Sequence, residues 1–236
     1  MRQLPLGVRL RERASFESFH PAGHGVAVDV LQELAAHRRR GVFWLAGAAG
    51  SGKSHLLQAV CVAAARERRA AYLPLRELQA GGPEVLGGWH DTQSMCIDDV
   101  DVVLGQRSWE VALFNLHREL EERGASLVMS ASAPPRGLNF ALPDFASRSA
   151  HALLLTLGPL SEEEQRVALQ RHASLRGLEL PDETANYLLR RVPRDMERLV
   201  ALLDELDLAA LQAQRRLTVP FVREVLGPER AGSAAR

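Results

Sequence analysis

The sequence contains little cysteine, few aromatic side chains and almost no lysine. Of its 236 residues, two are Cys and 5% are aromatic, and Lys53 is the only lysine among 29 basic residues. Cys61 and Cys96 lie within apolar runs, which fits buried thiols in a reducing compartment better than a disulfide framework. No apolar run approaches the ~20 residues that span a bilayer, and the start lacks the apolar core of a signal peptide. We therefore expect a cytoplasmic protein that does not contact the membrane.

Neither positive nor negative charge is in excess. The 29 basic and 29 acidic side chains give a formal net charge of zero. No overall field therefore draws the molecule to DNA or to anionic lipid, and we expect any contact with DNA to be indirect. The hydrophobic fraction of 46% is sufficient for buried cores, so the chain is expected to form a globular protein of one domain or two small ones.

A glycine-rich loop carries the strongest chemical signal in the sequence. Residues 47–54 read G-A-A-G-S-G-K-S and match G-x-x-x-x-G-K-[ST], the loop whose backbone N–H groups wrap the phosphates of a nucleotide. Lys53 offers a compact ammonium to phosphate oxygens, and Ser54 offers a hydroxyl to Mg²⁺. The sequence therefore predicts a site for ADP or ATP with Mg²⁺. Its candidate nucleotide-binding residues are Gly47, Gly50, Ser51, Gly52, Lys53, Ser54 and His55.

Strands and helices alternate around this loop. Residues 42–46 are a buried strand candidate before it, and a helix with a buried face is expected after it, up to about Arg69. Another helix is expected with Ser108 as its N-cap and Gly124 just past its end. Further strands are expected at residues 71–75, 94–101 and 126–132, with one more buried strand at 151–157. Short apolar strands alternating with helices predict an α/β fold whose parallel sheet is covered on both faces.

Two acids end the third of these strands. Asp98 and Asp99 follow the apolar residues Met95 to Ile97. Because ligands of parallel sheets bind at the carboxyl ends of the strands, these carboxylates can reach a nucleotide's metal ion or orient a water molecule. We assign Asp98 to Mg²⁺ and Asp99 to the attacking water. The alternative is that the acids only end a strand and begin a turn.

From Gly158 the pattern changes to helices alone. Ser161, with Glu164 three residues later, forms a capping box that opens a helix. Further helices are expected at residues 182–192, 194–213 and 218–226. The chain is therefore expected to comprise an extended segment at 1–12, an α/β nucleotide-binding domain at 13–158, a small helical lid at 159–228 and a disordered tail at 229–236.

Together these features resemble the AAA+ ATPases, and among them the DnaA branch. The motifs that carry the resemblance are GKSHL, IDDV, MSASAPP, LPDFASRSAH and RDMERL, with ASFESFHPAG near the start. The resemblance implies that Arg148 is an arginine finger and that Arg194 is a second sensor that folds back onto the phosphates. It implies that Ser130 or Ser132 senses the γ-phosphate. It also implies that residues 14–23 line the adenine pocket.

The sequence ends ten residues after VPFVREVL, so we expect neither the DNA-reading domain nor the N-terminal interaction domain of DnaA. This architecture is similar to the DnaA-homologous regulators of the Hda family, which inactivate DnaA after initiation. The resemblance implies DnaA as a partner, whose ATP hydrolysis the chain would stimulate while its own turnover is weak. One alternative is a self-contained ATPase or helicase loader of the DnaC kind that works as a homo-oligomer. Another is a clamp-bound scaffold that catalyses nothing.

A short peptide near the start resembles the clamp-binding peptides of bacterial replication proteins. It reads QLPL, a Gln followed by apolar residues that include Leu. Pro5 disfavours both a helix and a central strand, so an extended tail is expected. Gln3 would satisfy polar groups at the edge of a groove, and Leu4 and Leu6 would fill its apolar pocket. The resemblance implies that the chain docks on the DNA polymerase III sliding clamp (beta) and meets DNA through it.

Overall fold

The structure is a computed structural model that describes residues 14–21, 23–89, 91–192 and 196–227. The chain divides into two compact units, with the boundary between Pro159 and Leu160. Each unit has its own core and is described by itself. In the described part of the chain, no helix combines the length and the apolar composition needed to cross a membrane.

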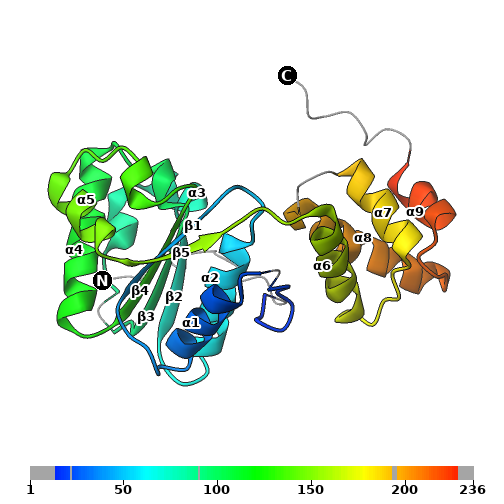
Figure 1. Ribbon diagram of the computed structural model, residues 1–236, viewed down its shortest axis with the longest axis horizontal. Helices are drawn as coiled ribbons and strands as arrows, with labels where there is room; N and C mark the ends of the chain where they lie inside the picture. The colour runs from blue at the N-terminus through cyan, green and yellow to red at the C-terminus, as the bar shows by residue number, and fades with distance from the viewer. Residues whose placement is uncertain (1–13, 22, 90, 193–195, 228–236) are drawn as a thin grey trace. The chain divides into compact units, whose positions relative to one another are not determined.

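The first unit is built on a five-stranded parallel sheet with strand order β2-β3-β4-β1-β5 (Figure 1). Its strands are β1 (Val42–Gly47), β2 (Ala70–Pro74), β3 (Ser94–Asp98), β4 (Ser126–Ala131) and β5 (Leu153–Leu157). The central strand β1 pairs with β4 on one side and with β5 on the other. Since all pairs are parallel, the carboxyl ends of the five strands lie along the same edge of the sheet.

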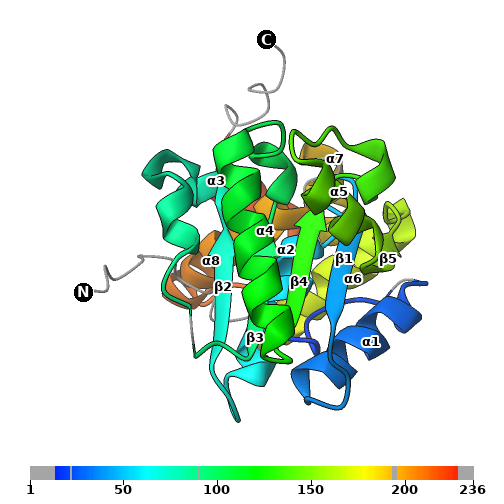
Figure 2. The same cartoon turned by 90° about the vertical axis from the view of Figure 1, so that its left-hand side faces the viewer.

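Helices cover both faces of this sheet, as the sequence predicts. One face packs against α1 (Gly25–Ala35) and α2 (Lys53–Ala64), and the other faces α4 (Arg107–Glu122) and α5 (Pro143–Ala150) (Figure 2). Shorter helices connect them: α3 (Leu75–Leu78), η1 (Gln79–Gly81), η2 (Pro83–Leu86), η3 (Val100–Val102) and η4 (Pro135–Gly137). Successive side chains of β1 point to opposite faces, so Trp44 joins the core beside α4 while Leu45 joins the core beside α2.

Three local predictions in this unit are wrong. The first turn of α4 begins at Arg107 with Gln106 at the N-cap position, so Ser108 lies inside the helix. Helix α2 ends at Ala64 because its buried face ends there, and the exposed residues 65–69 form the turn into β2. The strand expected to be buried at 151–157 is β5 at the edge of the sheet, where Leu153 and Leu154 are 44% and 45% exposed.

A buried carboxylate holds two loops to α4. Glu110 is fully buried and accepts hydrogen bonds from the backbone N–H groups of Gly105 (2.7 Å), Ala141 (2.9 Å) and Leu142 (2.6 Å). Gly105 precedes α4, and the other two residues precede α5. One side chain therefore satisfies three backbone donors that no strand or helix pairs, and it fixes where α5 begins.

The second unit is a small helical bundle, as the sequence predicts. It contains α6 (Glu162–Ser174), α7 (Asp182–Arg191), α8 (Met196–Ala213) and α9 (Val219–Leu226). The capping box that opens α6 is present in full, since Ser161 and Glu164 each bond to the other's backbone N–H. The helices share an apolar core that includes Leu169, Leu188 and Leu203.

Replacing Glu110 by Ala should lower the free energy of unfolding of the first unit by at least about 3 kcal/mol, because three buried N–H groups lose a charged acceptor. All three tryptophans, at positions 44, 89 and 109, lie in this unit, so tryptophan fluorescence during urea unfolding reports on it alone. The exposed Glu122→Ala change on the same helix is the control and should cost less than about 0.5 kcal/mol. Equal effects of the two changes would contradict this role of Glu110.

Candidate functional site

The glycine-rich loop joins the end of β1 to the start of α2, with a path that only glycine allows. Gly50 and Gly52 have φ angles of 76° and 93°, which lie in the left-handed region. A Cβ on Gly47 would lie 2.6 Å from Ser51 Oγ and 2.8 Å from the Leu157 carbonyl oxygen. A Cβ on Gly52 would lie 2.7 Å from the Phe19 ring. The glycines therefore permit both the tight turn and close packing of the loop.

Several polar groups in this loop suit phosphate oxygens. The Lys53 side chain is buried, and its Nζ donates to the carbonyl oxygens of Gly47 (2.8 Å) and Ala48 (3.0 Å). Ser51 Oγ is also buried and makes no hydrogen bond with any described residue. Helix α2 has Gly52 at its N-cap and no side-chain cap, so its first-turn N–H groups can receive an anion. A lysine, an unsatisfied hydroxyl and a helix N-terminus together fit a phosphate group.

The two candidate acids lie at the same edge of the sheet as this loop. Asp98 ends β3 and is buried, whereas the Asp99 side chain is 22% exposed. Strand β4 separates β1 from β3, which puts the acids roughly 10 Å from the loop across the sheet. That separation leaves room for a phosphate and a hydrated metal ion between them.

Asp98 is held by two hydroxyl donors. Tyr72 Oη donates to its Oδ2 at 2.7 Å, and Ser130 Oγ donates to its Oδ1. Burial, reinforced by the charge of Asp98, raises the pKa of Tyr72 above its ordinary range, so the phenol remains a donor. A carboxylate has about four lone-pair sites, which leaves Asp98 able to accept a further ligand. With the Ser54 hydroxyl at the start of α2, this donor set fits Mg²⁺, which takes few protein ligands beside phosphate oxygens.

Asp99 has a strained backbone and a different partner. Its φ and ψ are 55° and 49°, a left-handed conformation unusual for a residue other than glycine. Its Oδ2 accepts a hydrogen bond from Arg76 Nε at 2.8 Å, which raises the pKa of the guanidinium. The backbone N–H of Asp99 donates to Ser130 Oγ at 3.0 Å. The carboxylate is therefore turned toward Arg76.

The two candidate sensor residues lie in different surroundings. Ser130 is fully buried on β4 and contacts both acids, as its Oγ bonds the Asp98 carboxylate and the Asp99 N–H. Ser132 follows the strand and is exposed, and its N–H donates to Asp101 Oδ2 at 3.1 Å. Ser130 thus couples β4 to the acids, whereas Ser132 is the more accessible of the two.

The N-terminal segment that the sequence places beside the adenine packs on the start of α2. His55 Nε2 lies 3.0 Å from Ser18 Oγ and 2.9 Å from the Ser15 carbonyl oxygen. The His55 and Phe19 rings are 5.7 Å apart between centroids. His55 therefore anchors this segment next to the glycine-rich loop.

Arg148 lies at the other end of the sheet. It is on α5, and with Val42 and Ala125, near the starts of β1 and β4, it lines a pocket of about 670 Å³. Lys53 follows the end of β1, so the length of that strand, roughly 20 Å, separates the two. Arg148 Nη1 pairs with Glu121 Oε2 at 2.6 Å, and its guanidinium lies 5.1 Å from the centre of the Phe114 ring. It cannot reach the glycine-rich loop of its own chain.

Four predicted site residues fall outside the part of the chain that the structure describes. They are Gln3, Leu4 and Leu6 of the clamp peptide and Arg194 of the lid. Their roles stay predictions from the sequence.

Known proteins with this fold include replication initiators. Residues 162–226 match the family model described as "Hda, lid domain". Domain III of the replication initiation protein DnaA from Thermotoga maritima matches with a TM-score of 0.75 and 22% identity, covering 93% of this chain and 98% of that chain. The chain therefore has the fold of DnaA domain III.

Other solved structures share this fold. AMPPCP-bound DnaA from Aquifex aeolicus matches with a TM-score of 0.67 and 20% identity, covering 88% of this chain and 70% of that chain. The RuvB Holliday junction branch migration motor of Thermotoga maritima matches with a TM-score of 0.63 and 17% identity, covering 92% of this chain and 72% of that chain. The expected α/β AAA+ fold with a helical lid is confirmed.

Two residues of this candidate site were not anticipated from the sequence. Tyr72 lies on β2 and Arg76 on α3, and each bonds one of the two acids. The positions of both residues beside the acids follow from strand order, since β2 pairs with β3 in parallel and places Tyr72 opposite Cys96. A polar residue within an otherwise apolar strand is the signal that would have singled out Tyr72.

Ser130→Ala should lower the stability of the first unit by about 1–3 kcal/mol, because it leaves the Asp99 N–H and one Asp98 oxygen without the hydroxyl. Urea unfolding followed by tryptophan fluorescence measures this. Ser132→Ala is the matched control on the same segment and should change stability by less than about 0.5 kcal/mol. If Ser130→Ala is as stable as the parent protein, the hydroxyl does not hold the acids in place.

Proposed function

We propose that this chain is a regulator of replication initiation that stimulates hydrolysis of the ATP bound to DnaA. The observation that carries the proposal is the position of Arg148 at the end of the sheet opposite its own glycine-rich loop. An arginine placed there can serve only a nucleotide held by another subunit. The DnaA-like fold and the match of the lid to the Hda lid family support DnaA as that subunit.

The chain's own site would bind ADP or ATP. Lys53, Ser51 and the first-turn N–H groups of α2 supply donors for the phosphates. AMPPCP bound to the Aquifex aeolicus DnaA, which shares the fold, supports an adenine nucleotide. Mg²⁺ held by Ser54 and Asp98 would neutralise charge on the phosphate oxygens.

The surroundings of Asp99 support weak turnover at this site. Asp99 would orient the attacking water, yet its carboxylate is bonded to Arg76. An acid turned toward a guanidinium is a poorer partner for water than an unpaired one. Nucleotide would then act mainly as a switch, a role in which Arg194 of the lid and Ser130 or Ser132 would sense the phosphates.

Arg148 would act as an arginine finger. A guanidinium stabilises the charge that develops on the transferred phosphoryl group, which is worth roughly 10³–10⁵ in rate. Glu121 and Phe114 hold the side chain on the surface of α4 in the free protein. Exposed ion pairs contribute little free energy, so docking on DnaA could exchange Glu121 for phosphate oxygens at small cost.

Binding to the sliding clamp would restrict this activity to DNA on which synthesis has begun. The peptide QLPL, with Gln3, Leu4 and Leu6, is the segment proposed to enter the clamp's groove. The proposal places the protein on DNA-loaded clamps, so that DnaA would be inactivated only after synthesis has begun.

Arg148→Ala should reduce the stimulation of DnaA's ATP hydrolysis by roughly 10³-fold or to background, because the finger's charge is lost. The measurement is phosphate release by DnaA with DNA-loaded clamp and catalytic amounts of this protein. Arg118→Ala, which removes another exposed arginine paired on α4, is the matched control and should retain full stimulation.

Full stimulation by Arg148→Ala would contradict the finger assignment. Hydrolysis by this protein alone, rising with its own concentration, would instead favour the self-contained ATPase or helicase loader. Omitting DnaA from the assay separates these two results.

A further inference from the structure

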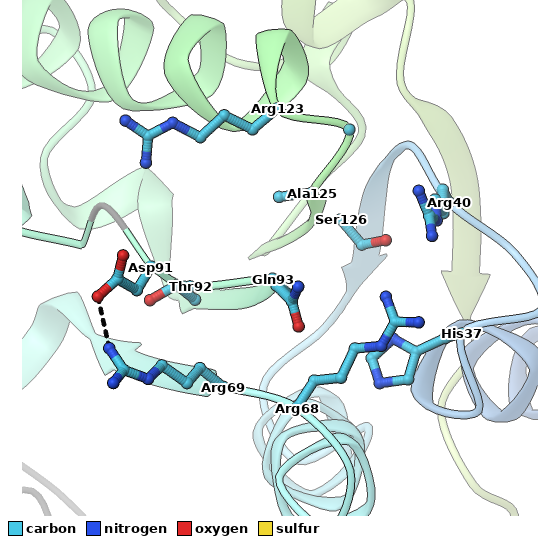
Figure 3. Close-up of a pocket in the computed structure, with 11 residues that line it drawn as sticks. His37, Arg40, Arg68, Arg69, Asp91, Thr92, Gln93, Arg123, Ala125 and Ser126 are labelled. Carbon is cyan, nitrogen blue, oxygen red and sulfur yellow. Dashed lines mark hydrogen bonds and ion pairs between the residues drawn. The ribbon is translucent and has the colours of Figure 1, made fainter.

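A basic pocket lies at the end of the sheet away from the glycine-rich loop. It has a volume of about 730 Å³ and lies where the chain enters β1, β2, β3 and β4 (Figure 3). The side chains that give it charge are Arg40, Arg68, Arg69, Arg123, His37 and Asp91. They come from four connecting segments that are distant in sequence, so the fold itself gathers them.

Positive charge dominates this basic pocket. Four guanidinium groups face one carboxylate among the lining residues, a net charge of +3 when His37 is neutral. Asp91 pairs with Arg69 at 2.5 Å, and Arg123 pairs with Glu119 at 2.8 Å. In the described part of the chain, the side chains of Arg40 and Arg68 make no recorded ion pair or hydrogen bond. In a chain of zero net charge, such a concentration calls for an anionic ligand.

His37 adds a second observation in the same pocket. Its Nε2 is buried and makes no hydrogen bond with any described residue. The residue also has a φ of 56°, so its backbone is held in a left-handed conformation. Burial lowers the pKa of His37, and the charges of Arg68 and Arg40 lower it further, against the opposing effects of Glu67 and of a hydrogen bond to the Ala64 backbone. An anion in the pocket would offset those charges and let Nε2 take a proton.

The make-up of the basic pocket points to phosphates of a nucleic-acid backbone. No Phe, Tyr or Trp side chain is among its lining residues in the described part of the chain, so it lacks the aromatic platform on which the bases of single strands typically stack. All four guanidinium groups belong to exposed residues, which suits a ligand lying across the surface better than an enclosed small molecule. Arginine binds phosphate oxygens in bidentate fashion and without reading sequence.

We infer that the basic pocket formed by Arg40, Arg68, Arg69, Arg123 and His37 binds the phosphodiester backbone of duplex DNA, independently of sequence. This site is separate from the glycine-rich loop and needs neither DnaA nor the sliding clamp. It goes beyond the proposed function and can fail without affecting it. If it holds, the protein contacts DNA directly as well as through a clamp.

The test is the binding of purified protein to a short fluorescent DNA duplex, measured by anisotropy between about 50 mM and about 200 mM salt. Arg40→Gln with Arg68→Gln should weaken binding about tenfold at the lower salt and reduce the slope of log affinity against log salt by about 2, since two phosphate contacts are lost. The matched control is Arg107→Gln with Arg136→Gln, two exposed arginines of the same unit that lie outside the pocket. It should bind DNA as the parent protein does.

Two further variants change binding in ways that a folding defect could not imitate. Asp91→Asn removes the one acid among the described residues that line the pocket and releases Arg69, so it should bind DNA more tightly than the parent protein. Binding by the parent should tighten as the pH falls from 7.5 to 6, because His37 gains a proton when phosphate is bound. His37→Gln should lose that gain and keep the binding seen at the higher pH.

Three kinds of result would overturn the inference. One is equal DNA binding by the parent protein and the Arg40/Arg68 double variant, or no binding by the parent at the lower salt. Another is displacement of DNA by ATP or tripolyphosphate at micromolar concentration, which would assign the pocket to a small phosphorylated ligand. The third is equally tight binding of fluorescent polyglutamate, which would assign it to acidic protein segments.

Discussion

The parallel pairing of β1 with β4 and β5, and of β3 with both β2 and β4, is the constraint on which the arrangement of the functional residues depends. It places the glycine-rich loop, the two acids and Ser130 at the carboxyl edge of one sheet. It places Arg148 and the basic pocket at the amino edge. Reversing β1 would send the loop to the other edge of the sheet, and reversing β3 would send the acids there, so the candidate phosphate site would not form.

At that edge, hydrogen bonds from neighbouring segments give the two acids different surroundings. Asp98 accepts hydrogen bonds from the hydroxyl groups of Tyr72 and Ser130, which fix its carboxylate at the end of β3. Asp99 is turned toward Arg76 by its left-handed backbone. A single hydroxyl, that of Ser130, contacts both residues. Two adjacent carboxylates thus have separate surroundings: Asp98 is buried between two hydroxyl groups, whereas Asp99 is partly exposed and paired with a guanidinium.

Local patterns in the sequence predict most of this first unit. The glycine-rich loop, the buried strand before it and the acids after β3 each depend on neighbours within a few residues, so their spacing is visible in the sequence. The capping box of α6 is local for the same reason, and it is present as expected.

Features made by tertiary packing could not be predicted in this way. Glu110 bonds the backbone of Ala141 and Leu142, which lie 31 and 32 positions later in the chain. Tyr72 bonds Asp98 from a different strand. The arginines of the basic pocket come together only because the four neighbouring strands β2, β3, β4 and β1 begin side by side. The exposure of β5 also depends on its place at the edge of the sheet, which an apolar run does not reveal. The net charge of zero, taken from composition, gives no sign of this local concentration of arginine.

The central claim is that the glycine-rich loop holds the phosphates of an adenine nucleotide through Lys53. Calorimetric titration of the nucleotide-free protein with ADP and Mg²⁺ tests it most directly, with Arg136→Ala as a control of unchanged binding. We expect one bound nucleotide per chain and at least a roughly tenfold loss of affinity in Lys53→Ala, since hydrogen bonds to charged groups contribute about 1.5–3 kcal/mol. Equal affinity of Lys53→Ala and the parent protein, or no binding by either, would contradict it.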